Sequence, residues 1–247
     1  MPLNEHGQPI GEAVPGWTPR PRPPRTPMTG RSCTVVPIDP ARHAAELHEA
    51  NARDVGGANF TYLFTTPLAT ADAYRAWMDS VAQSDDPLFH AVVDARTQRA
   101  VGVASFMRID PAMGVIEVGN INYSPLLQRS VASTEAMYLM MRRAFDELGY
   151  RRYEWKCDSL NAPSRATALR LGFSFEGIFR QAIVYKGRNR DTAWYSITDD
   201  EWPARRAGLE AWLAAENFGA DGAQRRRLGA CFENAGVRAR GSDAISG

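Results

Sequence analysis

The spacing of hydrophobic residues changes period near the middle of the chain, and the change predicts a strand, a loop and a helix. Residues 115–123 are rich in β-forming side chains and are bounded by Gly114 and by Ser124-Pro125, which predicts a strand. A helix is predicted to follow and to stop at Gly149. Its apolar residues recur at helical spacing: Met137, Met140, Met141, Ala144, Phe145 and Leu148. The loop before this helix would present free backbone N–H groups at the positive end of a helix dipole, an arrangement suited to a phosphate.

The same patterns predict further elements on both sides of this stretch. Before it, helices are predicted from Asp39-Pro40 and from about Thr70. After it, a helix is predicted to open at Asn161. The remaining predicted strands cover residues 32–38, 88–93, 100–106, 153–158, 173–185 and 191–198.

The two ends of the chain differ in composition from the part between them. Eight of the 16 prolines lie in residues 1–30, which favours a disordered or surface-draped arm; a polyproline ligand for a partner is the alternative. Residues 31–202 are expected to form the folded domain. Residues 203–247 are interpreted as an appended helix and a loose, Gly- and Arg-rich tail.

Charge and cysteine content exclude several classes of protein. Lys and Arg number 29 against 28 Asp and Glu, so no overall field attracts nucleic acid or a membrane surface. The three cysteines are far apart in the sequence, and no His and Cys residues have metal-ligand spacing, which argues against a disulfide framework and against a metal site. No apolar run approaches the ~20 residues of a membrane span. We expect a cytoplasmic protein without a metal.

Two motifs carry a resemblance to a known family. The loop Gln128-x-x-Val131-x-Ser133, and Asn161-x-x-Ser164 followed by Leu171-Gly172-Phe173, resemble the core of the Gcn5-related N-acetyltransferase (GNAT) superfamily, although Val131 stands where that family usually has Gly. The resemblance covers roughly residues 31–202, and it is greatest to the branch with the ribosomal-protein N-terminal acetyltransferases. It implies an α/β (α+β) fold, in which a mixed, mostly antiparallel sheet of six to seven strands splays at strands 4 and 5 and has helices on both faces.

The resemblance also implies acetyl-CoA as cosubstrate. Backbone amides of the loop would hold the pyrophosphate, and backbone around Gly119 would hold the pantetheine arm and polarise the thioester carbonyl. The alternative is that Gly119 only relieves steric crowding against a neighbouring helix. The residues expected to bind acetyl-CoA are Gly119, Asn120, Ile121, Gln128, Arg129, Ser130, Val131, Ala132, Ser133, Thr134, Asn161, Ser164 and Arg165.

Two residues are candidates for moving protons. Glu117 is an acid within an otherwise apolar strand; it could act as a base, directly or through water, or form a salt bridge with an arginine such as Arg108. Many family members protonate the thiolate with a Tyr at the position of Ala168. Ser164 is the best substitute in this chain, although it could also serve to cap a helix together with Asn161.

The resemblance places the acceptor beside the helix pair that follows the first strand. Phe60, Tyr62 and Phe64 are therefore candidate acceptor contacts, or else core residues under a loop. We expect an N-acetyltransferase in which a primary amine, on a small molecule or a protein N-terminus, attacks acetyl-CoA directly in a ternary complex. The alternatives are a catalytically impaired coenzyme A-binding regulatory protein and a transferase for a larger acyl-CoA. A homodimer is also expected, on the family and on the apolar residues Leu209, Trp212 and Leu213.

Overall fold

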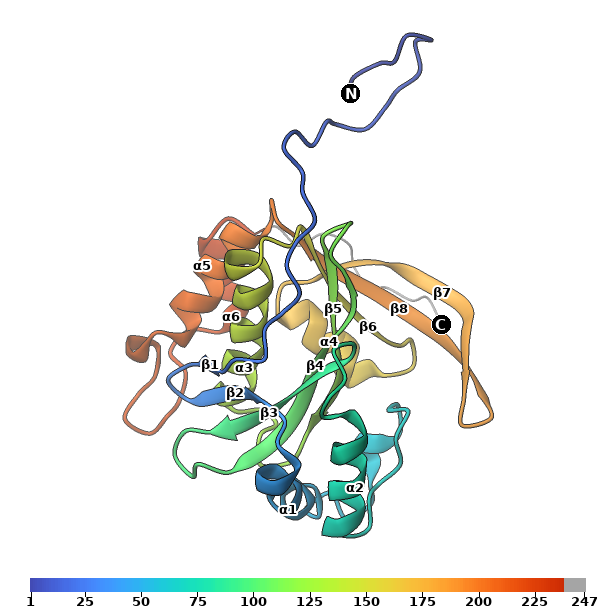
Figure 1. Cartoon of the computed structure of the whole chain (residues 1–247). Helices are drawn as coiled ribbons and strands as arrows, with labels where there is room; N and C mark the ends of the chain where they lie inside the picture. The colour runs from blue at the N-terminus through green and yellow to red at the C-terminus, as the bar shows by residue number, and fades with distance from the viewer. Residues whose placement is uncertain (238–247) are drawn as a thin grey trace.

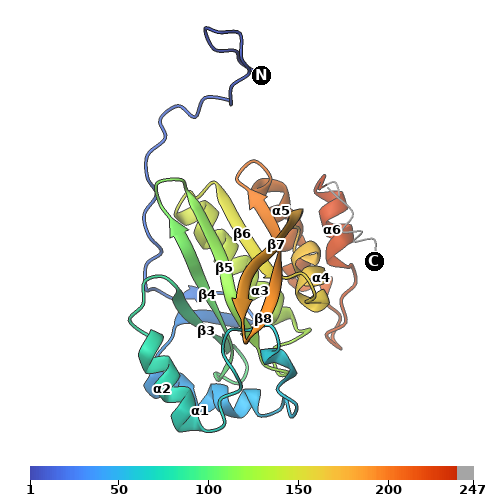
Figure 2. The ribbon, with the colours of Figure 1, turned by 90° about the vertical axis from the view of Figure 1, so that its right-hand side faces the viewer.

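The strands of this chain join into one sheet in which every neighbouring pair but one runs antiparallel (Figures 1 and 2). The computed structural model describes residues 1–237, and its eight strands lie in the order β1-β2-β3-β4-β5-β6-β8-β7. The strands are β1 (Met28–Thr29), β2 (Cys33–Pro37), β3 (Leu88–Asp94), β4 (Ala100–Asp110), β5 (Val115–Tyr123), β6 (Arg152–Asp158), β7 (Ser174–Tyr185) and β8 (Arg188–Thr198). The mixed, mostly antiparallel sheet is confirmed, with one strand more than expected because β1 adds to the edge.

Helices cover both faces of the sheet, as expected. One apolar core lies beneath α1 (Pro40–Asn51) and α2 (Ala71–Val81), and a larger core lies on the opposite face beneath α3 (Val131–Arg142) and α5 (Trp202–Leu213). α4 (Ala162–Arg170) and α6 (Leu228–Asn234) belong to the second side (Figure 2). Short 3₁₀ helices occupy residues 58–60 and 215–217, and a π-helical turn at residues 143–147 ends the long helix.

Side-chain caps explain where several of these helices begin. Asp39 accepts hydrogen bonds from the backbone of the first turn of α1, and Thr70 does the same for α2. Ser130 caps α3, and Asn161 caps α4. The helices capped by Asp39, Thr70 and Asn161 begin within a residue or two of the sequence prediction, whereas α3 begins at Val131, inside the stretch expected to be loop.

The sheet opens between β5 and β6, which is the feature that creates a binding site. The two strands are paired from Val115↔Arg152 to Val118↔Trp155, and the pairing stops there. On the other side of β5, the register to β4 slips by one residue between Gly119 and Asn122, and Asn120 has a φ of 50°. Such a bulge bends the strand and strengthens its twist, which turns the end of β5 away from β6.

The N-terminal arm divides into two parts. The first residues project away from the domain (Figure 1). From Trp17 onward the arm packs on the sheet: the Trp17 indole donates to the Ala112 carbonyl over 2.9 Å and lies where a β-carbon on Gly114 would stand. Arg25 donates to the carbonyls of Ala82 and Ser84, each over 2.7 Å.

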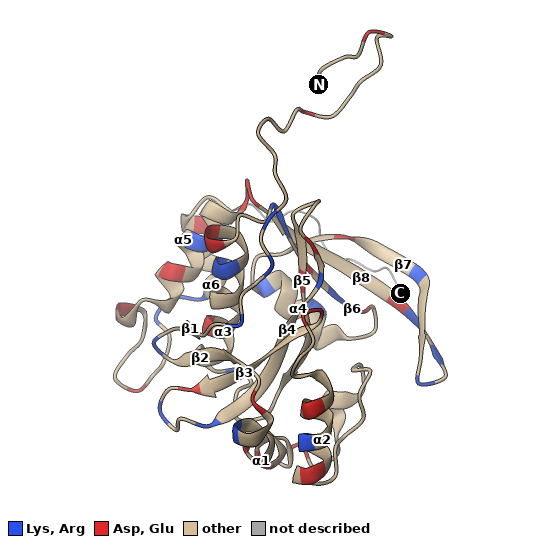
Figure 3. Cartoon of the chain, in the orientation of Figure 1, with Lys and Arg blue, Asp and Glu red and all other residues tan. Residues whose placement is uncertain are grey.

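The C-terminal extension is packed onto the domain over residues 203–237; residues 238–247 of the predicted tail lie outside the described residues. Leu209 and Trp212 are buried within the same chain. They are therefore not available as the dimer contact that suggested self-association, which stays a prediction. Basic and acidic residues are interspersed along the ribbon (Figure 3). Within residues 1–237, the helices are all too short or too polar to cross a bilayer.

Candidate active site

A cavity of about 800 Å³ lies where β5 and β6 separate. Its wall comes from the end of β5, from Trp155 of β6, from the loop before α3, from α4 and from the C-terminal extension. Two arginines and no acidic residue line it among the residues that the structure describes. The lining residues are Asn59, Ile121, Asn122, Tyr123, Gln128, Arg129, Ser130, Val131, Ser133, Thr134, Met137, Trp155, Asn161, Pro163, Ser164, Thr167, Arg170, Leu171, Trp212, Phe218, Gly222 and Gln224.

The loop before α3 presents an anion-binding arrangement to this cavity. Val131 and Ala132 are the first two residues of α3, and their N–H groups find no acceptor within the described part of the chain. Arg129, with a φ of 56°, makes the turn that precedes the helix. The residue with left-handed backbone is thus Arg129, which explains why Val131, at a position where the resemblance expects glycine, is compatible with this loop. Free N–H groups, the helix dipole and a nearby guanidinium together favour a phosphate.

Ser164 lies on the cavity wall with its side chain held in place. The indole Nε1 of Trp155 donates to Ser164 Oγ over 2.9 Å, while the Ser164 backbone N–H donates to Asn161 Oδ1 over 3.1 Å. The expected capping role of Asn161 is thus present together with an ordered Ser164 hydroxyl. Burial raises the pKa of the adjacent Cys157 thiol, and its hydrogen bond with Ser164 opposes that rise. The Cys157 thiol beside Ser164 is accordingly protonated and uncharged.

Glu117 lies on β5 just before the bulge and is almost fully buried, with 3% of its surface exposed. Its Oε2 accepts from Lys156 over 2.8 Å and from Arg108 over 3.0 Å, so the salt bridge considered as its alternative role is present. No hydrogen bond reaches Oε1 from any described residue. This oxygen lies 3.5 Å from the point where a β-carbon on Gly119 would stand, and the same β-carbon would overlap the Met107 sulfur. The Met107 side chain therefore fills the space beside Gly119, and Glu117 lines neither the large cavity nor the smaller one described next.

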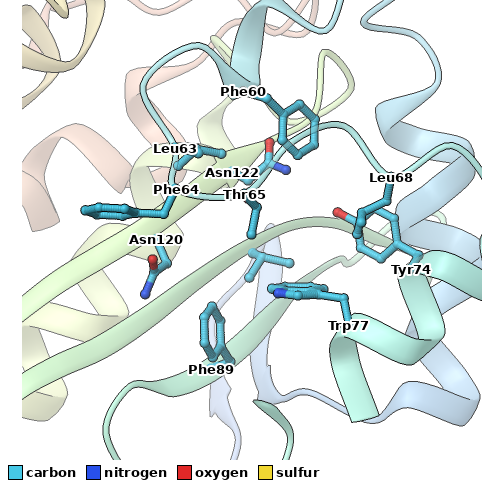
Figure 4. A pocket seen from close by; sticks show the side chains of 11 residues that line it. Phe60, Leu63, Phe64, Thr65, Leu68, Tyr74, Trp77, Phe89, Asn120 and Asn122 are labelled. Carbon is cyan, nitrogen blue, oxygen red and sulfur yellow. The ribbon is translucent and has the colours of Figure 1, made fainter. Parts of the chain in front are cut away.

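A second, smaller cavity of about 40 Å³ lies beside the bulge (Figure 4). Aromatic and aliphatic side chains from the connector after α1, from α2 and from the sheet surround it, together with two asparagines of β5. No charged residue lines it among residues 1–237. Its lining comprises Phe60, Leu63, Phe64, Thr65, Leu68, Tyr74, Trp77, Phe89, Val103, Asn120 and Asn122.

Asn122 is shared by the two cavities. It is only 8% exposed, and its Oδ1 is buried without a hydrogen-bond partner in the described residues. A buried, unpaired carbonyl oxygen is costly unless a ligand or a water completes it. Asn122 therefore holds an unpaired hydrogen-bond acceptor at the place where the two cavities adjoin.

The structure brings together most of the predicted acetyl-CoA contacts but not all of them. The large cavity contains Ile121, Asn161, Ser164 and the loop residues 128–131, 133 and 134. Gly119, Ala132 and Arg165 are not in its lining, and Asn120 lines the small cavity instead. Ala168 is fully buried in the core and carries no ionisable group.

Only two of the three predicted acceptor contacts lie in the same cavity. Phe60 and Phe64 line the small cavity, whereas the Tyr62 hydroxyl donates to the Leu160 carbonyl over 3.1 Å and the residue lies outside that lining.

Sequence reasoning missed the residues that complete each cavity. Tyr74, Trp77 and Phe89 line the small one, and their spacing signals core packing rather than a site. Arg170, Trp212, Phe218 and Gln224 line the large one, and no motif singles them out. Tyr123 also faces the large cavity; burial raises its pKa well above its ordinary value. Within residues 1–237, no group of three or more His, Cys, Asp or Glu side chains could hold a metal ion.

Comparison with known proteins identifies the kind of domain that carries this site. Residues 33–174 match the family model described as an acetyltransferase (GNAT) domain. The structure is similar to a GCN5-related N-acetyltransferase from Brucella melitensis, with 49% identity over 89% of this chain and 100% of that one and a TM-score of 0.87. A structure described as a probable GNAT-family acetyltransferase from Chromobacterium violaceum ATCC 12472 shows 38% identity over 79% of this chain and 98% of that one, with a TM-score of 0.73.

A more distant similarity concerns the fold alone. A candidate ribosomal-protein-serine acetyltransferase from Vibrio cholerae is 19% identical over 70% of this chain and 97% of that one, with a TM-score of 0.60. A search of curated proteins found no match.

Proposed function

This chain belongs to the GNAT family of acetyltransferases, and from that premise we propose that it is an N-acetyltransferase that moves the acetyl group of acetyl-CoA to a primary amine. The observation that carries the proposal is the position of Asn122, which lines both the acid-free cavity at the opening of the sheet and the aromatic cavity beside it. Two substrates bound in these cavities would meet at the end of β5, as direct transfer in a ternary complex requires.

The donor would occupy the large cavity. Its pyrophosphate is assigned to the N-terminus of α3, where Val131 and Ala132 supply unpaired N–H groups and Arg129 supplies a positive charge. The pantetheine arm is assigned to the opening between β5 and β6, where the backbone beyond Val118 has no partner on β6. That assignment brings the thioester close to Ser164 and to the bulge of β5.

The acceptor amine would enter the small cavity, with Phe60 and Phe64 among its contacts. Among the described residues the lining has no acid to attract a second cationic group. At about 40 Å³ the cavity has room for the amino group and the first atoms of its carrier, against aromatic faces that suit a cation or an apolar chain. The unpaired Oδ1 of Asn122 can accept a hydrogen bond from the amine. Substrates with one amine on an apolar carrier are expected to be favoured over strongly charged ones.

Proton transfer is assigned to Glu117. Oε2 is occupied by Lys156 and Arg108, which leaves Oε1 beside Gly119 to take the amine proton through a water molecule. As the nitrogen–carbon bond forms and the carbon–sulfur bond breaks, the leaving thiolate would accept a hydrogen bond from the Ser164 hydroxyl. The transfer needs no covalent intermediate with the protein.

The test is a panel of amines and peptides assayed for release of free thiol from acetyl-CoA, with propionyl- and succinyl-CoA run in parallel. We expect turnover with acetyl-CoA and an apolar primary amine. Binding of coenzyme A without turnover of any acceptor would favour the alternative of a regulatory coenzyme A-binding protein. Faster turnover with a longer acyl chain would favour the alternative of a transferase for larger acyl groups.

A further inference from the structure

The large cavity continues past the loop before α3 and ends on the C-terminal extension. Trp212, at the end of α5, and Phe218, Gly222 and Gln224, in the segment before α6, form this part of the wall. All four lie beyond residues 33–174, the part of the chain that matches the GNAT domain model. The extension is therefore part of the binding cavity and not an appendage beside it.

Hydrogen bonds hold this segment in one conformation. The Trp212 indole donates to Gln224 Oε1 over 2.9 Å, and Phe218 pairs with Gln224 through an isolated β-bridge. Asn217, buried at the base, donates to the Trp212 carbonyl over 2.9 Å and accepts from the Arg226 backbone over 2.9 Å. Because each polar group at the base is paired, the wall is preformed rather than assembled by a ligand.

Arg170 provides a positive charge at this end of the cavity. Its Nη1 donates to Thr134 Oγ1 over 3.0 Å, and its guanidinium carbon lies 5.3 Å from the centre of the Trp212 ring. No carboxylate within residues 1–237 forms an ion pair with Arg170. The stacking and the Thr134 contact fix the plane of the guanidinium and leave most of its five N–H donors available.

The chemistry of coenzyme A suggests what this end would bind. The molecule consists in order of a pantetheine arm, a pyrophosphate and an adenosine carrying a 3′-phosphate. If the first two units lie as proposed above, the third must lie beyond the α3 loop. We propose that the extension forms a subsite for the adenosine 3′-phosphate end, with Phe218 and Gln224 beside the adenine and Arg170 contacting the 3′-phosphate. This inference rests on the proposed use of a coenzyme A donor.

A series of shortened ligands tests the subsite by calorimetry on the full chain. The series consists of coenzyme A, dephospho-coenzyme A, which lacks the 3′-phosphate, and 4′-phosphopantetheine, which lacks the adenosine end. A charge-assisted contact from Arg170 predicts that dephospho-coenzyme A binds roughly ten- to a hundredfold more weakly than coenzyme A. Phosphopantetheine should bind more weakly again.

Three variants assign the contacts. Arg170→Gln should weaken coenzyme A to the level of dephospho-coenzyme A and leave dephospho-coenzyme A unchanged. Phe218→Ala should weaken both nucleotide ligands and leave phosphopantetheine unchanged, which also shows that the variant is folded. Arg96→Gln is the matched control, since Arg96 is exposed in the turn between β3 and β4 and lines neither cavity.

The outcomes separate the inference from the function on which it rests. If the wild-type chain binds none of the three ligands, the proposed acetyl-CoA donor is wrong. If coenzyme A binds but Arg170→Gln behaves like Arg96→Gln, or if phosphopantetheine binds as tightly as coenzyme A, the donor stands and the subsite is overturned.

Discussion

The indole Nε1 of Trp155 donates a hydrogen bond to the hydroxyl oxygen of Ser164 over 2.9 Å, at the point where the pairing of β5 and β6 ends. Because the indole is a donor only, it engages a lone pair of the hydroxyl and leaves the hydroxyl proton to be donated to the Cys157 sulfur or to a bound ligand. The residue that ends the strand pairing therefore also orients the one hydroxyl that we assign to the leaving sulfur.

Replacing Ser164 with Ala should lower kcat by roughly ten- to a hundredfold, because a hydrogen bond to a charged group contributes ~1.5–3 kcal/mol. The start of α4 should survive, since Asn161 caps it through the backbone N–H of residue 164, which alanine keeps. Steady-state kinetics and a melting curve check both expectations. An unchanged kcat would show that the thiolate leaves without help from this hydroxyl.

Glu117→Gln should lower the rate by roughly 10²–10⁴ at neutral pH, with little change in acetyl-CoA affinity, because it removes the proposed base. Glu154→Gln is the matched control. Glu154 also pairs with Lys156 and is also buried, but it lies on β6 and its two oxygens are engaged by Arg152 and Lys156. Similar rate losses in two folded variants would mean that the charge network around Lys156, and not a base, is responsible. The pH–rate profile of Glu117→Gln separates the cases.

Phe64→Ala should raise the KM of the amine with little effect on stability, because this ring lines the small cavity and is 55% exposed. Tyr62→Phe, which loses only the hydrogen bond to the Leu160 carbonyl, should leave KM nearly unchanged. The comparison distinguishes two aromatic residues of one connector. Equal effects of the two substitutions would place the acceptor outside the small cavity.

Deleting residues 1–25 should preserve kcat, since no residue of the arm lines either cavity. It should nevertheless lower the melting temperature by several degrees, because it removes the Trp17 contact with Gly114 and the Arg25 hydrogen bonds to Ala82 and Ser84. Deleting residues 1–16 should leave the melting temperature unchanged. A loss of activity with an intact fold would mean that the arm contributes to the site.

His90 should make the folded state less stable in acid. Burial lowers its pKa from 6.5 to about 4, although its Nδ1 is hydrogen-bonded to the Leu88 carbonyl. Between these two values the unfolded chain binds a proton that the folded chain does not, so stability falls as the pH drops through this window. The loss between pH 7.5 and pH 5 should be about 2 kcal/mol. Urea unfolding should show a smaller loss in His90→Asn than in His6→Asn, the exposed control.

Helix-capping residues and a helix-ending glycine predicted the ends of the helices well, because each of them acts on backbone groups only a few residues away. Asp39, Thr70 and Asn161 each cap the helix that the sequence starts there, and Gly149, with a φ of 70°, ends the long one. What the sequence could not predict was β1, because its two residues follow Pro27 and show no alternation. The π-helical turn before Gly149 was missed for a related reason, since its residues keep an ordinary helical pattern.

The site was harder to predict, because its residues converge from distant segments. The motif residues Asn161 and Ser164 were found, as they set local structure and site together. Trp212 was not, since an apolar residue at helical spacing looks the same whether it packs on a core or borders a cavity. Phe218 was not, because it lies after the short 3₁₀ helix, in a segment without a regular pattern. Val131 shows a third case: the backbone of the loop turns at Arg129, and only the structure reveals which residue of the motif needs an unusual conformation.

The opening between β5 and β6 also makes the stability of the folded protein depend on the concentration of its ligand. Past Val118, β5 has backbone groups that no residue of β6 meets, so a bound molecule that pairs with them completes the sheet. Such a molecule binds only the native chain and adds RT ln(1 + [L]/Kd) to the free energy of unfolding, about 2.7 kcal/mol at a hundredfold excess over Kd. The stability of the protein in the cell would then depend on the concentration of its acyl donor. A larger fraction of the molecules would unfold when the donor is scarce than when it is abundant.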